Sequence, residues 1–180
     1  MSAETEELKR IAAALERLAD FFEKHHTPFY EDESKVLDER VCECCGTDAT
    51  VLDGKPVVVY RDRSENETRD ISIATLGGHL KTINQDNWKI EGCPVNGPSL
   101  DAIDSTMVAT WFTSPDMKSA SKLVFIKEGV SSKPILLSNQ TIGRVDVALV
   151  DKEHAIACWL ETCSTGMFVV TSKVSKEGIV

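Results

Sequence analysis

Three segments of the chain repeat one pattern of strands and turns, and this repeat limits the fold more than any other feature of the sequence. In each segment a short strand leads to an Asp near a turn, and a second, apolar strand then ends in an aromatic residue. The Asp residues are Asp53, Asp104 and Asp151, and the aromatic residues are Tyr60, Trp111 and Trp159. The aromatic residues are 51 and 48 residues apart. A period near 50 residues with about four strands per unit predicts β-propeller blades.

The region from residue 41 onward has the pattern of an all-β structure. Its short apolar runs are bounded by Gly, Pro, Asp, Asn or Ser, which is typical of strands separated by turns. The runs are 57–60, 107–112, 123–126, 145–150, 155–160 and 167–170. Such runs also suit a sandwich or a barrel, and the period of the repeat favours the propeller. We therefore predict a mainly β fold, a partial propeller of about three four-stranded blades over residues 41–180.

The first 27 residues have a helical pattern instead. Their large apolar residues are spaced three and four positions apart, as in a heptad seam. These residues are Leu8, Ile11, Leu15, Leu18 and Phe22. We predict an amphipathic helix over 1–27, ended by Pro28, and an acidic linker over 28–40. Two uses of the helix stay open: packing on its own domain, or a short coiled coil that associates chains.

The overall composition indicates an ordinary globular protein. A net charge of −9 argues against non-specific nucleic-acid binding. No apolar run reaches the roughly 18 residues of a membrane span. The acidic start, MSAETEELKR, lacks the basic and apolar regions of a secretion signal, which predicts a cytoplasmic protein. In that compartment the six cysteines would be reduced thiols or metal ligands more often than a disulfide framework.

Four motifs in the β region resemble those of a known family. They are RVCECCGTDATV, VVYRDRSENETRDIS, WKIEGCPVNGPSL and GRVDVALVDKEHAIACWLE. In these motifs and in their order, over about residues 38–175, the chain resembles bacterial sialidase-like (exo-α-sialidase-related) six-bladed β-propeller proteins. The resemblance implies a propeller related to glycan-processing hydrolases, with exported relatives. It does not fix an activity, because one fold supports many chemistries.

The chain is shorter than this resemblance requires. A six-bladed propeller needs roughly 300 residues at about 50 per blade, whereas 180 residues leave room for three blades. Open blades expose sheet faces and edge strands. We therefore expect a homo-oligomer, with a dimer favoured because two chains related by a twofold axis would complete a six-bladed ring. A compact monomer is the alternative.

The charged run after Tyr60 is the first candidate site. Arg61 and Arg63 would share one face of a continued strand, and arginine forks bind carboxylates in bidentate fashion. The predicted ligand-binding residues are Arg61, Arg63, Arg144, Asp146 and Trp88. The resemblance would make this site a sialidase-type glycoside hydrolase with Asp62 and Asp70 as catalytic residues. The alternative is that the charges form internal salt bridges that fix the loop.

The cysteines are the second candidate site. Cys42, Cys44 and Cys45 form a C-x-C-C motif, and Cys93 lies in the turn-rich EGCPVNGP. Thiolate clusters bind soft ions, although C-x-C-C is not the usual zinc spacing. Three interpretations stay open: metal ligands, redox-active thiols, or structural thiols, including a disulfide from one of the three to Cys93. No cofactor is certain from the sequence; the candidates are Zn and Cu at this cluster.

These observations favour a non-catalytic module that binds a glycan or another anionic ligand, or assembles, and that self-associates. A sialidase-type glycoside hydrolase with an arginine clamp is the enzymatic alternative. A thiolate metal-binding protein is the third hypothesis. Nucleic acid and a membrane span are not expected.

Overall fold

The computed structural model describes residues 36–75 and 81–180. Residues Leu37–Val180 form one compact unit, which contains every described strand. The predicted helix over 1–27, with its predicted coiled coil, lies outside the described residues, as does most of the predicted linker. Within the described ranges no helix is long and apolar enough to cross a membrane.

The strands form three antiparallel sheets. The first sheet has the order β1 (Asp48–Leu52), β2 (Lys55–Arg61), β3 (Ile71–Thr75) and β4 (Lys81–Asn84). The second has the order β5 (Ser99–Ile103), β6 (Thr106–Thr113), β7 (Ala120–Lys127) and β8 (Val130–Ser131), and β9 (Ile135–Ser138) also pairs with β7. The third has the order β10 (Thr141–Leu149), β11 (His154–Cys163), β12 (Gly166–Ser175) and β13 (Gly178–Ile179).

The turns explain how the sequence repeat produces one sheet per segment. Asp53 and Gly54 join β1 to β2 with φ values of 49° and 73°, as a two-residue type I′ turn requires. Asp104 begins the turn at the corresponding position between β5 and β6, with a φ of 51°. Asp151 lies between β10 and β11 and accepts hydrogen bonds from the backbone N–H groups of Glu153 and His154. The repeated Asp therefore marks the first hairpin of each sheet.

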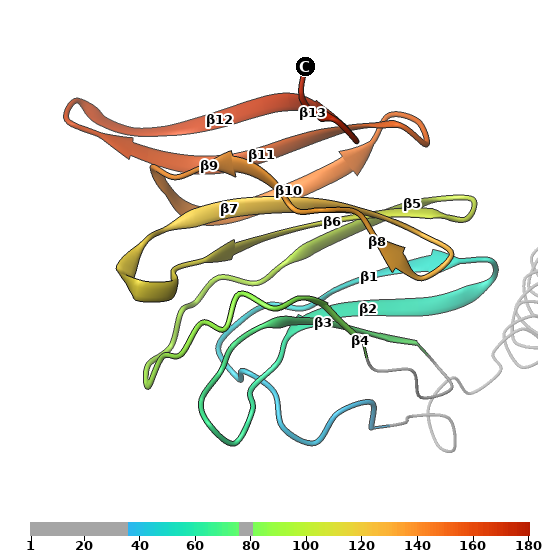
Figure 1. Ribbon diagram of the computed structural model, residues 1–180, viewed down its shortest axis with the longest axis horizontal. Helices are drawn as coiled ribbons and strands as arrows, with labels where there is room; N and C mark the ends of the chain where they lie inside the picture. Colours follow the sequence, from blue (N-terminus) through green and yellow to red (C-terminus); the bar gives the residue numbers. More distant parts are fainter. Residues whose placement is uncertain (1–35, 76–80) are drawn as a thin grey trace, which may run out of the picture. The chain divides into compact units, whose positions relative to one another are not determined.

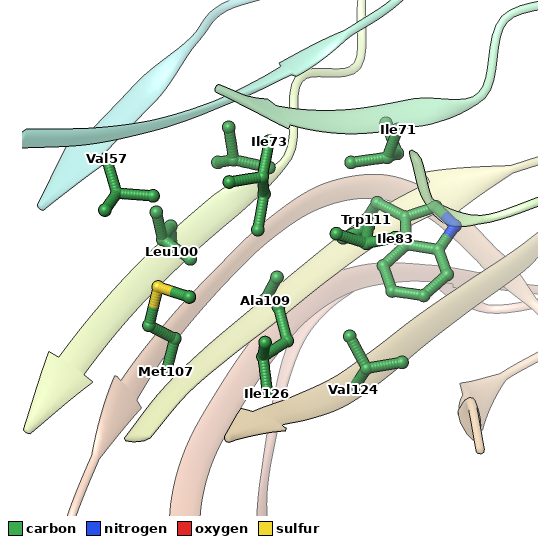
Figure 2. Close-up of a cluster of buried hydrophobic side chains, with 11 residues drawn as sticks. Val57, Ile71, Ile73, Ile83, Leu100, Met107, Ala109, Trp111, Val124 and Ile126 are labelled. Atoms are coloured by element: carbon green, nitrogen blue, oxygen red, sulfur yellow. The ribbon is translucent and has the colours of Figure 1, made fainter. Parts of the chain in front are cut away.

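Two hydrophobic clusters hold the sheets together in layers, with the second sheet between the first and the third (Figure 1). The first cluster joins the first and second sheets around Trp111, as Figure 2 shows. The second cluster joins the second and third sheets around Trp159. The aromatic residues of two repeats thus lie in the two clusters, as their apolar strands predict.

Strand β6 is buried on both faces because a sheet covers each side of it. Met107, Ala109 and Trp111 face the first cluster, and Val108 faces the second. Alternate residues of a strand point to opposite faces of its sheet, so one strand serves both clusters. Such a strand reads as a continuous apolar run, which is the pattern in the sequence.

Carboxylates on the first strand of one sheet bind the backbone of the next sheet. Asp48 in β1 accepts hydrogen bonds from the Leu100 N–H at 2.8 Å and the Ser99 hydroxyl at 3.1 Å. Asp101 in β5 accepts one from the Leu149 N–H at 2.7 Å. An Asp carboxylate on the first strand of one sheet therefore connects each pair of neighbouring sheets by hydrogen bonds.

The predicted fold class, propeller blades preceded by an amphipathic helix, must be corrected. The described part of the chain is mainly β and has no α-helix; its helical segment is the 3-10 turn η1 (Pro115–Met117). The second sheet carries the extra strand β9, so the sheets are not uniform four-stranded blades. The repeat specifies hairpins and sheets by local turns and strand patterns. It does not specify closure round an axis, and the three sheets do not show a propeller.

Candidate functional site

The cysteine cluster lies in the turn that precedes β1. The backbone N–H of Cys42 donates to the carbonyl of Arg61 at 3.0 Å, which attaches this turn to the end of β2. The N–H of Cys45 donates to the carbonyl of Cys42 at 3.3 Å and closes the turn. The Cys42 sulfur is 3.4 Å from the Cys45 sulfur and 3.6 Å from the Cys44 sulfur. The three sulfurs all lie within 4.8 Å of one another.

Cys93 joins the cluster through a disulfide bond with Cys44. This bond connects the turn before β1 to the loop between β4 and β5, across 49 residues, with 6.1 Å between the two Cα atoms. The two segments approach closely because a glycine lies at their contact: a Cβ at Gly97 would be 2.3 Å from the Gly46 carbonyl oxygen. Of the interpretations left open by the sequence, the structure contains the disulfide to Cys93. Cys42 and Cys45 are free thiols.

Arg61, the last residue of β2, is a buried cation next to this cluster. Its side chain donates to three backbone carbonyls: Asn96 at 3.1 Å, Arg69 at 2.7 Å and Phe112 at 2.5 Å. Its guanidinium also lies 5.1 Å from the centre of the Trp88 ring, a cation–π distance. With an exposed fraction of 1%, Arg61 joins three segments of backbone. It does not present a fork to solvent, which the predicted anion clamp requires.

Trp88 is also part of this buried layer. It is 6% exposed and packs edge-on against Phe112, with 5.7 Å between ring centroids and an interplanar angle of 76°. Its ring therefore contacts protein on the side of Arg61 and on the side of Phe112. A carbohydrate-stacking role, the reason for naming Trp88 from the sequence, needs an exposed ring face.

Cys45 lies between this buried cation and a backbone donor. Partial burial raises the pKa of the Cys45 thiol, while the Asn96 N–H and the Arg61 guanidinium act in the opposite direction. Cys42 is more deeply placed, with an exposed fraction of 5%. Of the two free thiols in the cluster, Cys45 is thus the one that solvent reaches more easily.

Arg63 faces a carboxylate from its own loop. Its Nε and Nη2 bind Glu67 at 3.2 and 3.1 Å, and its Nη1 binds Glu43 at 2.8 Å. Arg40 and Arg69 bind the same Glu67 at 3.1 and 2.6 Å. The hydrogen bond from Arg63 lowers the pKa of Glu67, and the bond to Glu67 raises the pKa of Arg63. The salt bridges of Glu67 with Arg63 and Arg69 lie within the loop, as in the alternative stated above, and those of Arg40 and Glu43 attach the loop to the segment before β1.

The two carboxylates predicted to be catalytic have different surroundings. Asp62 accepts hydrogen bonds from the Ser72 hydroxyl at 3.2 Å and from the Arg63 N–H at 2.6 Å. Burial raises the pKa of Asp70, and the neighbouring Asp86 raises it further. Asp70 Oδ1 is buried and has no hydrogen-bond partner in the described part of the chain. No observation assigns the two carboxylates to one reaction.

The predicted ligand residues of the third sheet bind protein groups as well. Arg144 Nη1 donates to the Val95 carbonyl at 2.6 Å, and the Arg144 N–H donates to the Asn96 side chain at 2.9 Å. Asp146 accepts a hydrogen bond from the Ser99 hydroxyl at 2.7 Å. Arg61 and Arg144 therefore meet at the loop that contains Asn96, and both of them hold its backbone.

Sequence reasoning missed three residues of these networks. Arg40 and Arg69 complete the cations around Glu67, and their only signal was membership in charged runs. Asp86 accepts hydrogen bonds from Trp111 Nε1 at 2.7 Å and from Lys122. Nothing in the polar INQDNW stretch distinguished it. Its pairing with Trp111 depends on the contact between the loop after β4 and strand β6, which no local pattern encodes.

No family model matches the chain, and the comparisons with curated proteins and with solved structures found no match. The resemblance to sialidase-like propellers therefore rests on the sequence motifs alone and stays a prediction.

Proposed function

We propose that this chain is a non-catalytic module that binds one soft metal ion, Zn²⁺ or Cu(I), through Cys42, Cys44, Cys45 and Cys93. The observation that carries the proposal is the gathering of four cysteine sulfurs from two distant segments. Three of the sulfurs lie within 4.8 Å of one another, and the fourth is bonded to one of them. Soft thiolates select such ions over hard cations.

The spacing of the sulfurs supports this ligand set. Zn–S bonds of about 2.3 Å in a tetrahedral site place neighbouring sulfurs about 3.8 Å apart. The Cys42 sulfur lies 3.6 Å from one neighbour and 3.4 Å from the other. Metal binding by Cys42, Cys44 and Cys45 thus requires small displacements of these three side chains, and Cys93 is held beside Cys44 by the disulfide bond. Metal binding also requires that the Cys44–Cys93 bond be reduced, since a disulfide sulfur is not a thiolate.

A titration of fully reduced protein tests the proposal. The protein is reduced with a phosphine, kept free of oxygen, and mixed with Zn²⁺ or Cu(I) before native mass spectrometry. We expect one ion per chain. Cys45→Ser should weaken binding by at least about 100-fold, because removing even an outer-shell partner costs roughly 10- to 100-fold. Cys163→Ser is the matched control, since Cys163 is an exposed cysteine elsewhere in the fold. Equal binding by both variants, or no binding by the parent, would contradict the proposal.

Assembly of chains is the second candidate function, and one observation favours it. Ile156, Met167 and Val169 lie on the same face of the β11–β12 hairpin, opposite the face of Trp159. Met167 is 71% exposed and Val169 is 77% exposed. In this chain the inner faces of the three sheets pack on one another through apolar side chains. A second copy of the chain is the occupant we propose for this outer face.

A further inference from the structure

We infer that Cys42 and Cys45 form a dithiol that undergoes reversible exchange with disulfides and closes into an intramolecular disulfide. The two residues have the C-x-x-C spacing of redox-active pairs. The backbone hydrogen bond from Cys45 N–H to the Cys42 carbonyl holds them in one turn. Their sulfurs are 3.4 Å apart, and the Cys42 thiol donates to the Cys45 sulfur. The inference goes beyond metal binding and needs no metal.

The burial of the two thiols assigns their roles. Cys45 is partly exposed, so its sulfur is the one that an external disulfide reaches. Cys42 is 5% exposed, which protects it from external disulfides and leaves the Cys45 sulfur as its reachable partner. In exchange reactions the thiolate is the nucleophile.

The reaction has two steps. The Cys45 thiolate attacks one sulfur of a disulfide RSSR, a Cys45–SR bond forms, the S–S bond of RSSR breaks, and the first RS⁻ leaves. The Cys42 thiolate then attacks the Cys45 sulfur, a Cys42–Cys45 bond forms, and the second RS⁻ leaves. The two protons lost by the cysteines are taken up by the two thiolates. Two cysteine thiols are oxidised, and one RSSR is reduced to two RSH.

The neighbouring Cys44–Cys93 disulfide has a structural role in the proposed reaction. It contributes no free thiol, and it attaches the C-x-x-C turn to the loop of Asn96. The Cys42 sulfur is also 3.6 Å from Cys44. Attack of Cys42 on Cys44 would release Cys93 and create a Cys42–Cys44 bond, which is the reaction that competes with the one proposed. The two reactions give different linked peptides.

Peptide mapping of metal-free protein separates these outcomes. The full chain carrying Cys158→Ser and Cys163→Ser is treated with excess oxidised glutathione, alkylated, digested and analysed by mass spectrometry. We expect Cys42 and Cys45 to become linked while Cys44–Cys93 persists, with two glutathione thiols released per chain. Added dithiothreitol, at a level that spares Cys44–Cys93, should restore both thiols. Unlinked Cys42 and Cys45 at equilibrium, or a Cys42–Cys44 link, would overturn the inference.

A pair of variants tests the two roles separately. In Cys42→Ser the exchange should stop at a mixed disulfide between glutathione and Cys45, because the resolving thiol is absent. In Cys45→Ser, Cys42 should gain glutathione at least tenfold more slowly, because it is buried. Equal rates in the two variants would contradict the assigned roles. Since the mapping uses metal-free protein, failure to bind zinc or copper would sink the proposed function and leave this inference standing.

Discussion

At the scale of single residues, Arg61 shows how a charged side chain can organise a β structure from inside. Its guanidinium satisfies carbonyls of three segments that are distant in the sequence. A buried carbonyl without a partner costs about 1 to 3 kcal/mol. Removing this one side chain therefore affects several loops together, among them the loop that contacts the cysteine turn.

Substitution of Arg61 should destabilise the fold much more than substitution of Arg63. We expect Arg61→Met to lower the free energy of unfolding by about 3 kcal/mol or more, because it leaves three buried carbonyls without their donor, at about 1 to 3 kcal/mol each. Arg63→Met should lower the free energy of unfolding much less, because its salt bridges to Glu43 and Glu67 are partly exposed to solvent. Urea unfolding of both variants measures the difference. Similar midpoints would show that the three buried carbonyls find other partners.

Asp70 gives the fold a pH dependence of defined sign. Its pKa is raised in the folded state by burial and by Asp86. The folded state therefore binds the Asp70 proton more tightly than the unfolded chain does. Protonation of Asp70 stabilises the folded state, and this stabilisation is complete below the unfolded pKa and is lost as the pH rises through the folded pKa. We expect Asp70→Asn to be more stable than the parent at pH 7 and equally stable near pH 3.5. Urea midpoints at the two pH values measure this, with the exposed turn variant Asp53→Asn as the control. A gain that is independent of pH would contradict the assignment.

At the scale of elements, the Cys44–Cys93 bond determines how firmly the first sheet is closed. It links the segment before β1 to the segment after β4, so all four strands of the first sheet lie between the two bonded cysteines in the sequence. A cross-link across 49 residues removes chain entropy from the unfolded state. In the chain-entropy model this amounts to about 4 kcal/mol.

Loss of this bond should lower the free energy of unfolding by about 2 to 4 kcal/mol. The double variant Cys44→Ser, Cys93→Ser, compared with the parent under non-reducing conditions, gives the value by urea unfolding. A reductant should remove the difference in stability between the double variant and the parent. The variant Cys158→Ser, Cys163→Ser is the control, because it also lacks two cysteines but keeps the Cys44–Cys93 bond. If the double variant unfolds at the midpoint of the non-reduced parent, the bond contributes nothing to stability.

Much of the element structure was predictable from the sequence, whereas the candidate site was predictable only in part. Asp53 and Asp104 marked their hairpin turns because positive φ and polar side chains are local properties of the chain. The burial of the Arg61 and Trp88 side chains was not predictable, because the groups that they contact belong to other segments of the chain. The period-two rule placed Arg61 and Arg63 on one face, yet β2 ends at Arg61. The cysteine motif indicated a cluster but not which cysteine pairs with Cys93.

At the scale of the whole molecule, the outer face of the third sheet carries apolar side chains that the described sheets leave uncovered. The face carries Met167 and Val169, both highly exposed. Apolar sheet faces of this kind favour association with other chains. This face is therefore where we expect a second copy to bind.

The mass of the protein in solution tests that expectation. We expect the parent to be a dimer at micromolar concentration by light scattering, and Val169→Asp to be a monomer, because a buried unpaired charge costs several kcal/mol. Val130→Asp is the matched control, since Val130 is 69% exposed but lies in β8 of the second sheet. A monomeric parent, or a Val169→Asp variant that stays dimeric, would contradict this assignment.

The two-sided burial of β6 has a consequence for cooperativity. Because one backbone supplies Met107 and Trp111 to one cluster and Val108 to the other, neither cluster can open while the strand stays in place for its neighbour. Displacing β6 exposes both clusters at once. The three layers should therefore melt in a single transition, although the sequence is built from three separate repeats.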